Sequence, residues 1–146
     1  MNLIYKTNLK KRIIATLIDY AIISIITYLY IELLGDDTPD GSKEVNGLLT
    51  LPIFIFWFLY FVVIETFYSA TLGHQALYLK VVTVDRKVIG FSQALKRRLL
   101  DPIDIIIYGI PAIITIKNTD KHQRLGDLWA KTIIIDTKDI EQTNIS

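Results

Sequence analysis

The 146-residue chain contains no cysteine and only two histidines, His74 and His122. Without cysteine it has no disulfide framework, no thiol nucleophile and no thiolate metal site. The histidines lie apart in segments that read as loops, so a two-histidine metal site is not expected. The sequence also lacks the GxSxG, P-loop and HExxH motifs of hydrolases, nucleotide-binding proteins and metalloproteases. These absences predict neither an enzyme nor a bound metal or cofactor.

Apolar residues, by contrast, are abundant and concentrated. They make up 51% of the chain and gather in two windows, 13–34 and 48–68. As helices, windows of this length reach roughly 30 Å, the thickness of the hydrocarbon core of a bilayer. No small-x-small cleavage site ends the first window before the acidic stretch 35–44, which argues against a cleaved signal peptide. The sequence therefore predicts two membrane-spanning helices.

The charged residues are separated along the chain, which predicts the orientation of the spans. The loop between the windows carries Asp36, Asp37, Asp40 and Glu44 against a single lysine. Basic residues flank the two spans on their other sides: Lys6, Lys10, Lys11 and Arg12 before the first, and Lys80, Arg86, Lys87, Lys96, Arg97 and Arg98 after the second. By the positive-inside rule both basic flanks are cytoplasmic. We expect a multi-pass protein of the inner or plasma membrane with a cytoplasmic N-terminus.

A third hydrophobic segment, 103–116, is short for a crossing, since it covers only about 21 Å as a helix. Pro102 precedes it, and Gly109 and Pro111 interrupt it. Both of its flanks are basic, which places both on the cytoplasmic side. These features favour a re-entrant or interfacial hairpin, with a third span as the alternative.

The remaining segments predict a small cytoplasmic β-element and a surface helix. Strand-forming residues suggest a β-hairpin over 78–89 and a further strand over 132–136. Helical spacing of apolar residues over 91–100 predicts a helix at the membrane surface, with Arg97 on its polar side. The expected fold class is a mainly α membrane protein.

Asp19 is the least ordinary residue, because it lies inside the first predicted span. A charged side chain at mid-helix costs at least about 2.5 to 3.5 kcal/mol, so it needs a partner or a function. Arg12 lies two turns earlier, although a partner on another helix is favoured. Glu65 should lie at a similar depth in the second span. The two carboxylates are candidates for binding a cation or sharing a proton, with helix packing for Asp19 and headgroup contact for Glu65 as alternatives.

A second arginine and aspartate pair repeats this spacing, because Arg97 and Asp104 are also seven residues apart. Asp101, Pro102 and Asp104 are also typical of a helix start, with a capping acid, a proline in the first turn and a further acid there. Both interpretations remain open from the sequence.

The segment 122–132 reads as a polar connection leading into a strand, and it contains Arg124, Gly126 and Asp127. Together, Arg12, Asp19 and Asp127 resemble the pattern of the RDD family of membrane proteins. That family is named for an arginine at the start of its first helix, an aspartate inside that helix and a second aspartate further on.

The resemblance covers nearly the whole chain from Lys11 to Asp136 and includes two further motifs. The stretch 71–74 is similar to the Thr-Leu-Gly-Lys of the family, and 91–104 to its Phe-x-x-Ala-Leu-x-Arg segment that ends in Asp. His74 stands in place of the usual lysine, and Lys131 in place of the usual glycine. The resemblance implies a single RDD-like membrane domain over 1–146.

The resemblance also implies the range of functions to consider. Transport of unidentified ligands has been suggested for the family, sodium/proton exchange has been attributed to some members, and others carry the domain in scaffold or assembly roles. We therefore expect transport of a small cation or proton, with a non-transporting scaffold as the alternative. The polar cluster implied by the family motifs is Arg12, Arg97, Asp104, Arg124 and Asp127. The expected partners are anionic lipid headgroups and further copies of the chain, since two spans enclose little volume, and nucleic acid is not expected.

Overall fold

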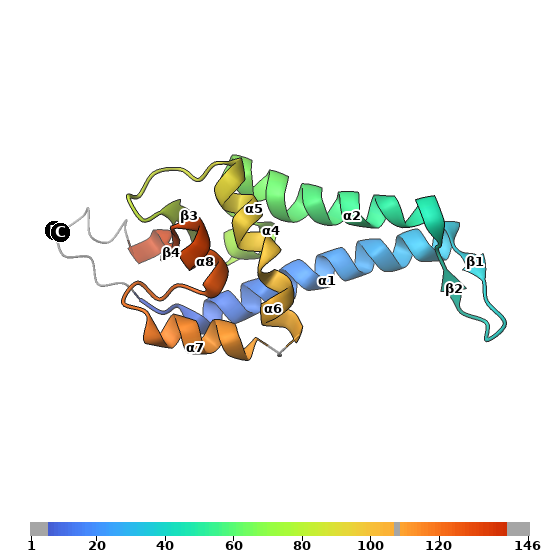
Figure 1. The fold of residues 1–146 in the computed structure, drawn as a ribbon, viewed down its shortest axis with the longest axis horizontal. Coiled ribbons are helices and arrows are strands. Elements are labelled where there is room, and N and C mark those ends of the chain that lie inside the picture. Colours follow the sequence, from blue (N-terminus) through green and yellow to red (C-terminus); the bar gives the residue numbers. More distant parts are fainter. Residues whose placement is uncertain (1–5, 107–108, 140–146) are drawn as a thin grey trace.

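The computed structural model describes residues 6–106 and 109–139, without the side chains of 105 and 106. It is an elongated, mainly helical molecule built on two long helical rods that lie side by side (Figure 1). The first rod is α1 (Leu9–Leu34). The second rod is helical throughout, but the type of helix changes along it. It consists of the 3-10 turn η1 (Gly47–Thr50), α2 (Leu51–Phe58), the π-helical turn η2 (Leu59–Val63) and α3 (Ile64–Tyr68). A small hairpin of β1 (Asp36–Asp37) and β2 (Lys43–Glu44) joins the rods.

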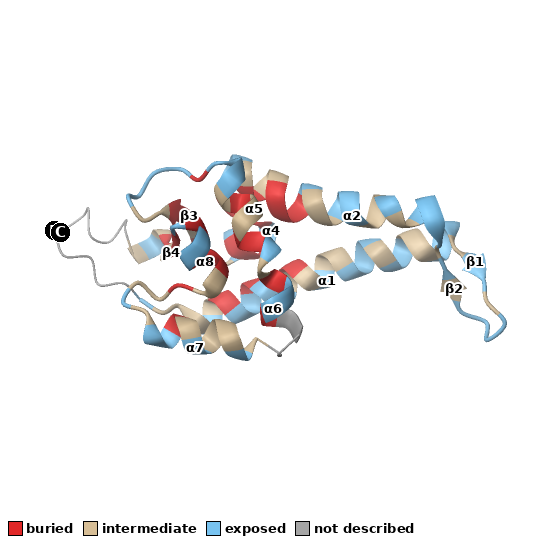
Figure 2. Ribbon diagram, viewed as in Figure 1, coloured by how far each residue is buried: buried red, intermediate tan, exposed pale blue. Residues whose placement is uncertain are grey.

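Both rods are long and apolar enough to cross a bilayer, and they are the two candidate spans among the described residues. Leu17, Leu33 and Phe54 are more than 60% exposed, at 64%, 79% and 68%. Water would be a poor solvent for such a surface, whereas lipid tails are a good one. Little of either rod is buried inside the molecule (Figure 2), so most of its apolar surface faces outward.

The remaining elements gather around the N-terminal end of α1, and we call this assembly the cap (Figure 1). The cap consists of α4 (Leu72–Ala76), β3 (Leu79–Thr83), α5 (Phe91–Leu99), α6 (Asp101–Ile106), α7 (Ile110–Asn118), α8 (Leu125–Ala130) and β4 (Thr132–Asp136). The acidic β1–β2 hairpin lies at the opposite end of the rods. The basic flanks and the acidic loop thus occupy the two ends of one elongated molecule.

The sheet of the cap differs from the predicted hairpin over 78–89. β3 pairs in antiparallel register with β4, so that Val81 lies opposite Ile134. The chain does turn back at Arg86, which has a φ of 62°. It then makes only a single bridge between Val82 and Val88, because it leaves the sheet at Gly90 to begin α5. The long-range strand over 132–136, rather than the local return, is therefore the main partner of β3.

Helix α5 lies within the predicted range 91–100, but its buried face is rotated towards Arg97 and away from Phe91 and Leu99. Ala94, Arg97 and Arg98 are buried, whereas Phe91 and Leu99 are about half exposed, at 50% and 52%. The expectation that Arg97 lies on the solvated side is wrong. Buried carboxylates on neighbouring elements compensate the two arginines, and amphipathic spacing within one helix does not reveal them.

The third hydrophobic segment, 103–116, is divided into α6 and α7, and residues 107–108 within it lie outside the described part. Gly109 caps α7 with a φ of 77°, and Pro111 lies in its first turn. A nine-residue helix such as α7 is only about 13 Å long. α7 turns back along the cap towards the N-terminal end of α1 (Figure 1). The two short helices have the connectivity of a hairpin; whether they enter the membrane stays a prediction.

The hydrophobic core lies where the rods meet the cap (Figure 2). Its buried members come from both rods, β3, the loop after it, α5 and β4, and are Ala15, Val62, Leu79, Val81, Ile89, Ala94 and Ile134. Among the described residues, the buried polar or charged side chains are as numerous as the buried apolar ones. Since an unpaired buried charge is costly, the pairing of these groups decides what the region can do.

Candidate functional site

Asp19 is 1% exposed and accepts hydrogen bonds from η2 and from α4 with its N-cap residue. One carboxylate oxygen, Oδ1, accepts from the Tyr60 hydroxyl and from the backbone N–H of Gly73, both at 2.7 Å. The other, Oδ2, accepts from the Thr71 hydroxyl at 2.5 Å. Donors on both oxygens compensate a buried carboxylate without a positive side chain. Asp19 thus fastens α1 to the second rod and to α4.

The π-helical turn η2 places Tyr60 against Asp19. A π-helical turn carries an extra residue, so it rotates the side chains that follow relative to an uninterrupted α-helix. Tyr60, Phe61 and Val62 within η2 are all buried. No sequence signal at 59–63 indicates this turn, which explains why Tyr60 was not anticipated as a partner of Asp19.

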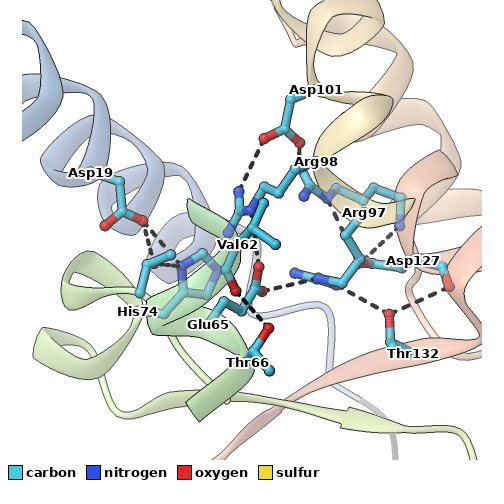
Figure 3. A network of polar contacts seen from close by, with 12 residues as sticks. Asp19, Val62, Glu65, Thr66, His74, Arg97, Arg98, Asp101, Asp127 and Thr132 are labelled. Carbon is cyan, nitrogen blue, oxygen red and sulfur yellow. Dashed lines mark hydrogen bonds and ion pairs between the residues drawn. The ribbon is translucent and has the colours of Figure 1, made fainter. Parts of the chain in front are cut away.

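His74 lies between Asp19 and Glu65 (Figure 3). Its Nδ1 is 2.9 Å from the Thr71 hydroxyl oxygen and 3.3 Å from Asp19 Oδ2. Because the single proton of the Thr71 hydroxyl goes to Asp19, His74 Nδ1 must carry a proton to donate in turn. Burial lowers the pKa of His74 below its ordinary value, although the hydrogen bond with Asp19 opposes this. The neutral imidazole is therefore the favoured form at neutral pH.

Gly73 allows the close contact between α4 and α1. A Cβ at this position would lie 2.8 Å from the Asp19 carboxylate and would also collide with the backbone oxygen of Ala15. Only glycine lets its backbone N–H reach Asp19 at this distance. The Thr-Leu-Gly motif at 71–73 therefore supplies a hydroxyl and an N–H to one carboxylate.

A second cluster, which we call the arginine network, contains the other family-motif residues. It comprises Arg12, Arg97, Arg98 and Arg124 together with Glu65, Asp101, Asp104 and Asp127. Its centre is Asp127, which is fully buried and pairs with both Arg12 and Arg97. Arg12 Nη2 lies 2.8 Å from Asp127 Oδ2, and Arg12 Nη1 donates to the His122 carbonyl at 2.6 Å. Of the three residues that name the family pattern, two pair directly and Asp19 lies in a separate cluster.

Glu65 joins the second rod to α5 through two arginines (Figure 3). Its Oε1 accepts from Arg97 Nε at 3.0 Å, and its Oε2 accepts from Arg98 Nε at 2.9 Å. The Arg98 guanidinium also lies over the Phe61 ring, 4.7 Å from the ring centroid. A carboxylate held by two guanidinium groups has little capacity left for a cation. The predicted pairing of Glu65 with Asp19 is not observed, since each carboxylate has its own set of donors.

Asp101 and Asp104, in the first turn of α6, have unequal environments. Asp101 lies 3.1 Å from Arg98 Nη1 and 2.7 Å from Arg124 Nη1. Burial alone would raise the pKa of Asp101, but Arg124 and Arg98 outweigh it and hold this pKa below its usual value. Its role is thus ion pairing, and its sequence-based interpretation as a simple helix cap misses these two partners.

Asp104 is the incompletely compensated acid of the network. Its nearest guanidinium nitrogen is Arg124 Nη1 at 3.7 Å, which Asp101 already holds more closely. Neither carboxylate oxygen has a hydrogen-bond partner among the described residues. Burial raises the pKa of Asp104, and the charges of Arg124 and Arg12 offset this only in part. Arg97, seven residues before Asp104 in the sequence, pairs instead with Glu65 and Asp127.

A cavity of about 450 Å³ lies between α1 and the α6–α7 pair. Asp104 and Asp19 line it, and so does Tyr20, whose hydroxyl is buried without a partner in the described part of the chain. Apolar side chains, among them Ile13 and Ile113, also line it. The arginines Arg12, Arg98 and Arg124 also reach this cavity. Its size falls within the usual range for small-molecule sites.

Helix α8 was missed by the sequence analysis, which read 122–132 as a connection. It begins after Arg124, whose backbone N–H donates to the Asp127 carboxylate at 3.1 Å. Gly126 packs against the backbone of Arg97, whose carbonyl oxygen would lie 2.6 Å from an added Cβ. Lys131 ends the helix with a φ of 54°. This left-handed conformation accounts for the usual glycine there, and a lysine adopts it at a cost of about 1 kcal/mol.

Comparison with known proteins gives one match. The model of the RDD family matches residues 7–131, which include α1, the second rod and the cap as far as the end of α8. Neither a curated protein sequence nor a solved structure gives a match. The matched range contains every residue of the Asp19 cluster and of the arginine network.

Proposed function

The chain belongs to the RDD family of membrane proteins, and on this basis we propose that it transports a small cation or protons, with exchange at Asp104. The observation that carries the proposal is a buried carboxylate, in a cavity between α1 and α6–α7, that has no hydrogen-bond donor among the described residues. Such a group gains a proton or a cation more readily than a fully paired one. Asp104 therefore replaces Asp19 and Glu65 as the proposed exchange position.

The charge balance of the region supports this proposal. The two clusters together contain four arginines and five carboxylates, the fifth being Asp19. One negative charge is therefore in excess when all the acids are ionised and His74 is neutral. A proton or a bound cation at Asp104 removes this excess. The groups around Asp104 that bear on its titration are Arg12 and Tyr20 on α1, Arg98 on α5, Asp101 on α6 and Arg124 before α8.

Flux measurements test the proposal. Purified protein in liposomes is placed under a sodium gradient or a pH gradient, and Asp104→Asn is compared with wild type. We expect flux in wild type and a fall to the level of protein-free liposomes in Asp104→Asn, because the amide cannot exchange a proton or carry a charge. Asp120→Asn is the matched control, since it removes the same charge from an exposed position just beyond α7. Equal flux in Asp104→Asn and wild type, with both folded, refutes exchange at Asp104.

A second candidate function is a non-transporting module that holds or assembles other membrane components. The saturated hydrogen bonding of Asp19 favours it, since this carboxylate already performs a structural task. Wild-type protein that sustains no flux under either gradient would support this module. Transport by the first candidate requires an oligomer, because two spans alone enclose too little volume for a pathway.

The proposed orientation places the cap in the cytoplasm of a cell whose inner or plasma membrane holds the two rods. Its support is the basic charge near the cap and the acidic charge of the β1–β2 hairpin. The cysteine-free chain allows single-cysteine labelling with a membrane-impermeant maleimide in intact cells. We expect Asp37→Cys, exposed in β1, to react from outside, and Asn118→Cys, exposed at the end of α7, to react only after permeabilisation. Labelling of both variants in intact cells would contradict the hairpin of 103–116, whereas labelling of Asn118→Cys but not of Asp37→Cys would contradict the orientation.

A further inference from the structure

The cavity between α1 and α6–α7 is lined by both polar and apolar side chains. Asp104, Asp19 and Tyr20 are among the polar ones. The apolar lining comes from residues of α1 and α7, namely Leu9, Ile13, Leu17, Ala112, Ile113 and Ile116. A bare inorganic ion would fill only a small part of about 450 Å³ and would leave the apolar wall unused. The shape and lining fit a molecule with one polar end and one apolar end.

The ion pairs that the cavity-lining residues already form determine which charge the polar end of a bound molecule should carry. Arg12, Arg98 and Arg124 reach the cavity, but each is ion-paired with an acid at 3.1 Å or less. An anion would therefore meet guanidinium charges that acids already balance, although Arg98 Nη2 and Arg124 Nε have no hydrogen-bond partner among the described residues. Asp104, in contrast, has no hydrogen-bond donor among the described residues, and the unpartnered Tyr20 hydroxyl can accept a further hydrogen bond. A positively charged N–H group can donate hydrogen bonds to the Asp104 carboxylate and to the Tyr20 hydroxyl oxygen.

We propose that this cavity binds an amphipathic organic cation, whose ammonium group pairs with Asp104 and whose apolar part lies against Ile13, Leu17 and Ile113. The inference rests on the proposed function in using the same carboxylate, and it names the class of substrate. A proton and the ammonium group compete for Asp104, so binding of one releases the other. An amphipathic cation enters such a site from the bilayer interface, where its apolar part already partitions.

Equilibrium binding of radiolabelled n-hexylammonium to the full chain in lipid nanodiscs tests this assignment. The probe resembles a lysine side chain and keeps its charge below about pH 10. Empty nanodiscs correct for partition into lipid. We expect saturable binding to wild type that weakens about tenfold or more in Asp104→Asn, because a charge-assisted contact is lost. Asp120→Asn should bind as wild type does. Unlabelled hexanol and hexanoate, of equal chain length, should not displace the probe.

A second variant keeps the test decisive if Asp104→Asn does not fold. Ala112→Phe fills the space next to the apolar lining residues without changing a charge and should also abolish binding. Saturable binding that survives in Ala112→Phe, or hexanoate that displaces the probe as well as hexylammonium does, overturns the assignment. So does unchanged affinity in a folded Asp104→Asn. Sodium or proton flux without hexylammonium binding would refute this inference alone, whereas binding without any flux would refute the proposed function alone.

Discussion

Replacement of Arg97 by methionine is expected to destabilise the protein by about 3 to 5 kcal/mol, the usual cost of breaking a buried ion pair. Arg97 is fully buried and pairs with both Glu65 and Asp127. It also donates to the Thr132 hydroxyl at 3.2 Å, which connects α5 to β4. Methionine retains much of the volume but leaves two buried carboxylates with one fewer positive partner each. Thermal unfolding in nanodiscs, followed by tryptophan fluorescence, measures the loss.

The control for this prediction is Lys117→Met, which removes one positive charge from an exposed position near the end of α7. It should change the melting temperature little. The pairing itself is tested by adding Asp127→Asn to Arg97→Met. The double variant should lose less than the two single losses combined, because the two residues share one interaction. A melting temperature in Arg97→Met equal to that of Lys117→Met would show that the arginine network does not hold the cap to the rods.

Replacement of Asp19 by leucine is expected to cost about 3 kcal/mol, since each buried donor left without an acceptor costs roughly 1 to 3 kcal/mol. Tyr60, Thr71 and the backbone N–H of Gly73 would lose their common acceptor. Asp19→Asn should cost clearly less. Its amide oxygen can take the place of Oδ1, and the Thr71 hydroxyl can reverse to accept from the amide nitrogen.

Melting temperatures of the two Asp19 variants check this order. Glu32→Leu is the matched control, because it removes a negative charge from an exposed position on the same helix. It should leave the melting temperature close to that of wild type. If Asp19→Leu melted at the wild-type temperature, the hydrogen-bond cluster would not stabilise the contact of α1 with α4. Equal and large losses in the leucine and asparagine variants would instead show that the charge, and not the number of acceptors, matters at this position.

The hydrogen bonds around Asp19 explain how a membrane helix tolerates this buried carboxylate. Neither a neighbouring arginine nor a cation is needed, because two hydroxyls and a backbone N–H supply the compensation. Arg12 is directed to Asp127 instead, more than a hundred residues away in the sequence. Asp104, which the sequence also allows as a helix-start residue, is the acid of the two clusters that has no donor within the described part of the chain. The residues of the family pattern thus have two separate structural roles: Asp19 holds α1 to its neighbours, and Arg12 pairs with Asp127. Arg12 and Asp19 also line the cavity that contains Asp104.

Several features follow from the sequence alone because they depend on local chemistry. The lengths and composition of 13–34 and 48–68 determine two helices that suit a bilayer, since every backbone polar group is satisfied within each helix. Strand-forming residues mark 79–83 and 132–136, and Gly109 with Pro111 breaks the third hydrophobic segment. The charge separation between the two ends of the molecule is equally a property of the order of residues.

Only the tertiary structure decided which charges meet. Arg97 looks like a surface residue in its own helix, and it becomes the most buried arginine because Glu65 and Asp127 arrive from other elements. Likewise, no local sequence signal indicates that β4 is the partner of β3, that a π-helical turn directs Tyr60 towards Asp19, or that a short helix contains Asp127. Pairing over long sequence separations depends on how helices pack and on how much water the packing excludes. The sequence determined that Asp19 must be compensated. The fold determined that hydrogen bonds compensate it, while residues 6–106 and 109–139 offer Asp104 no donor.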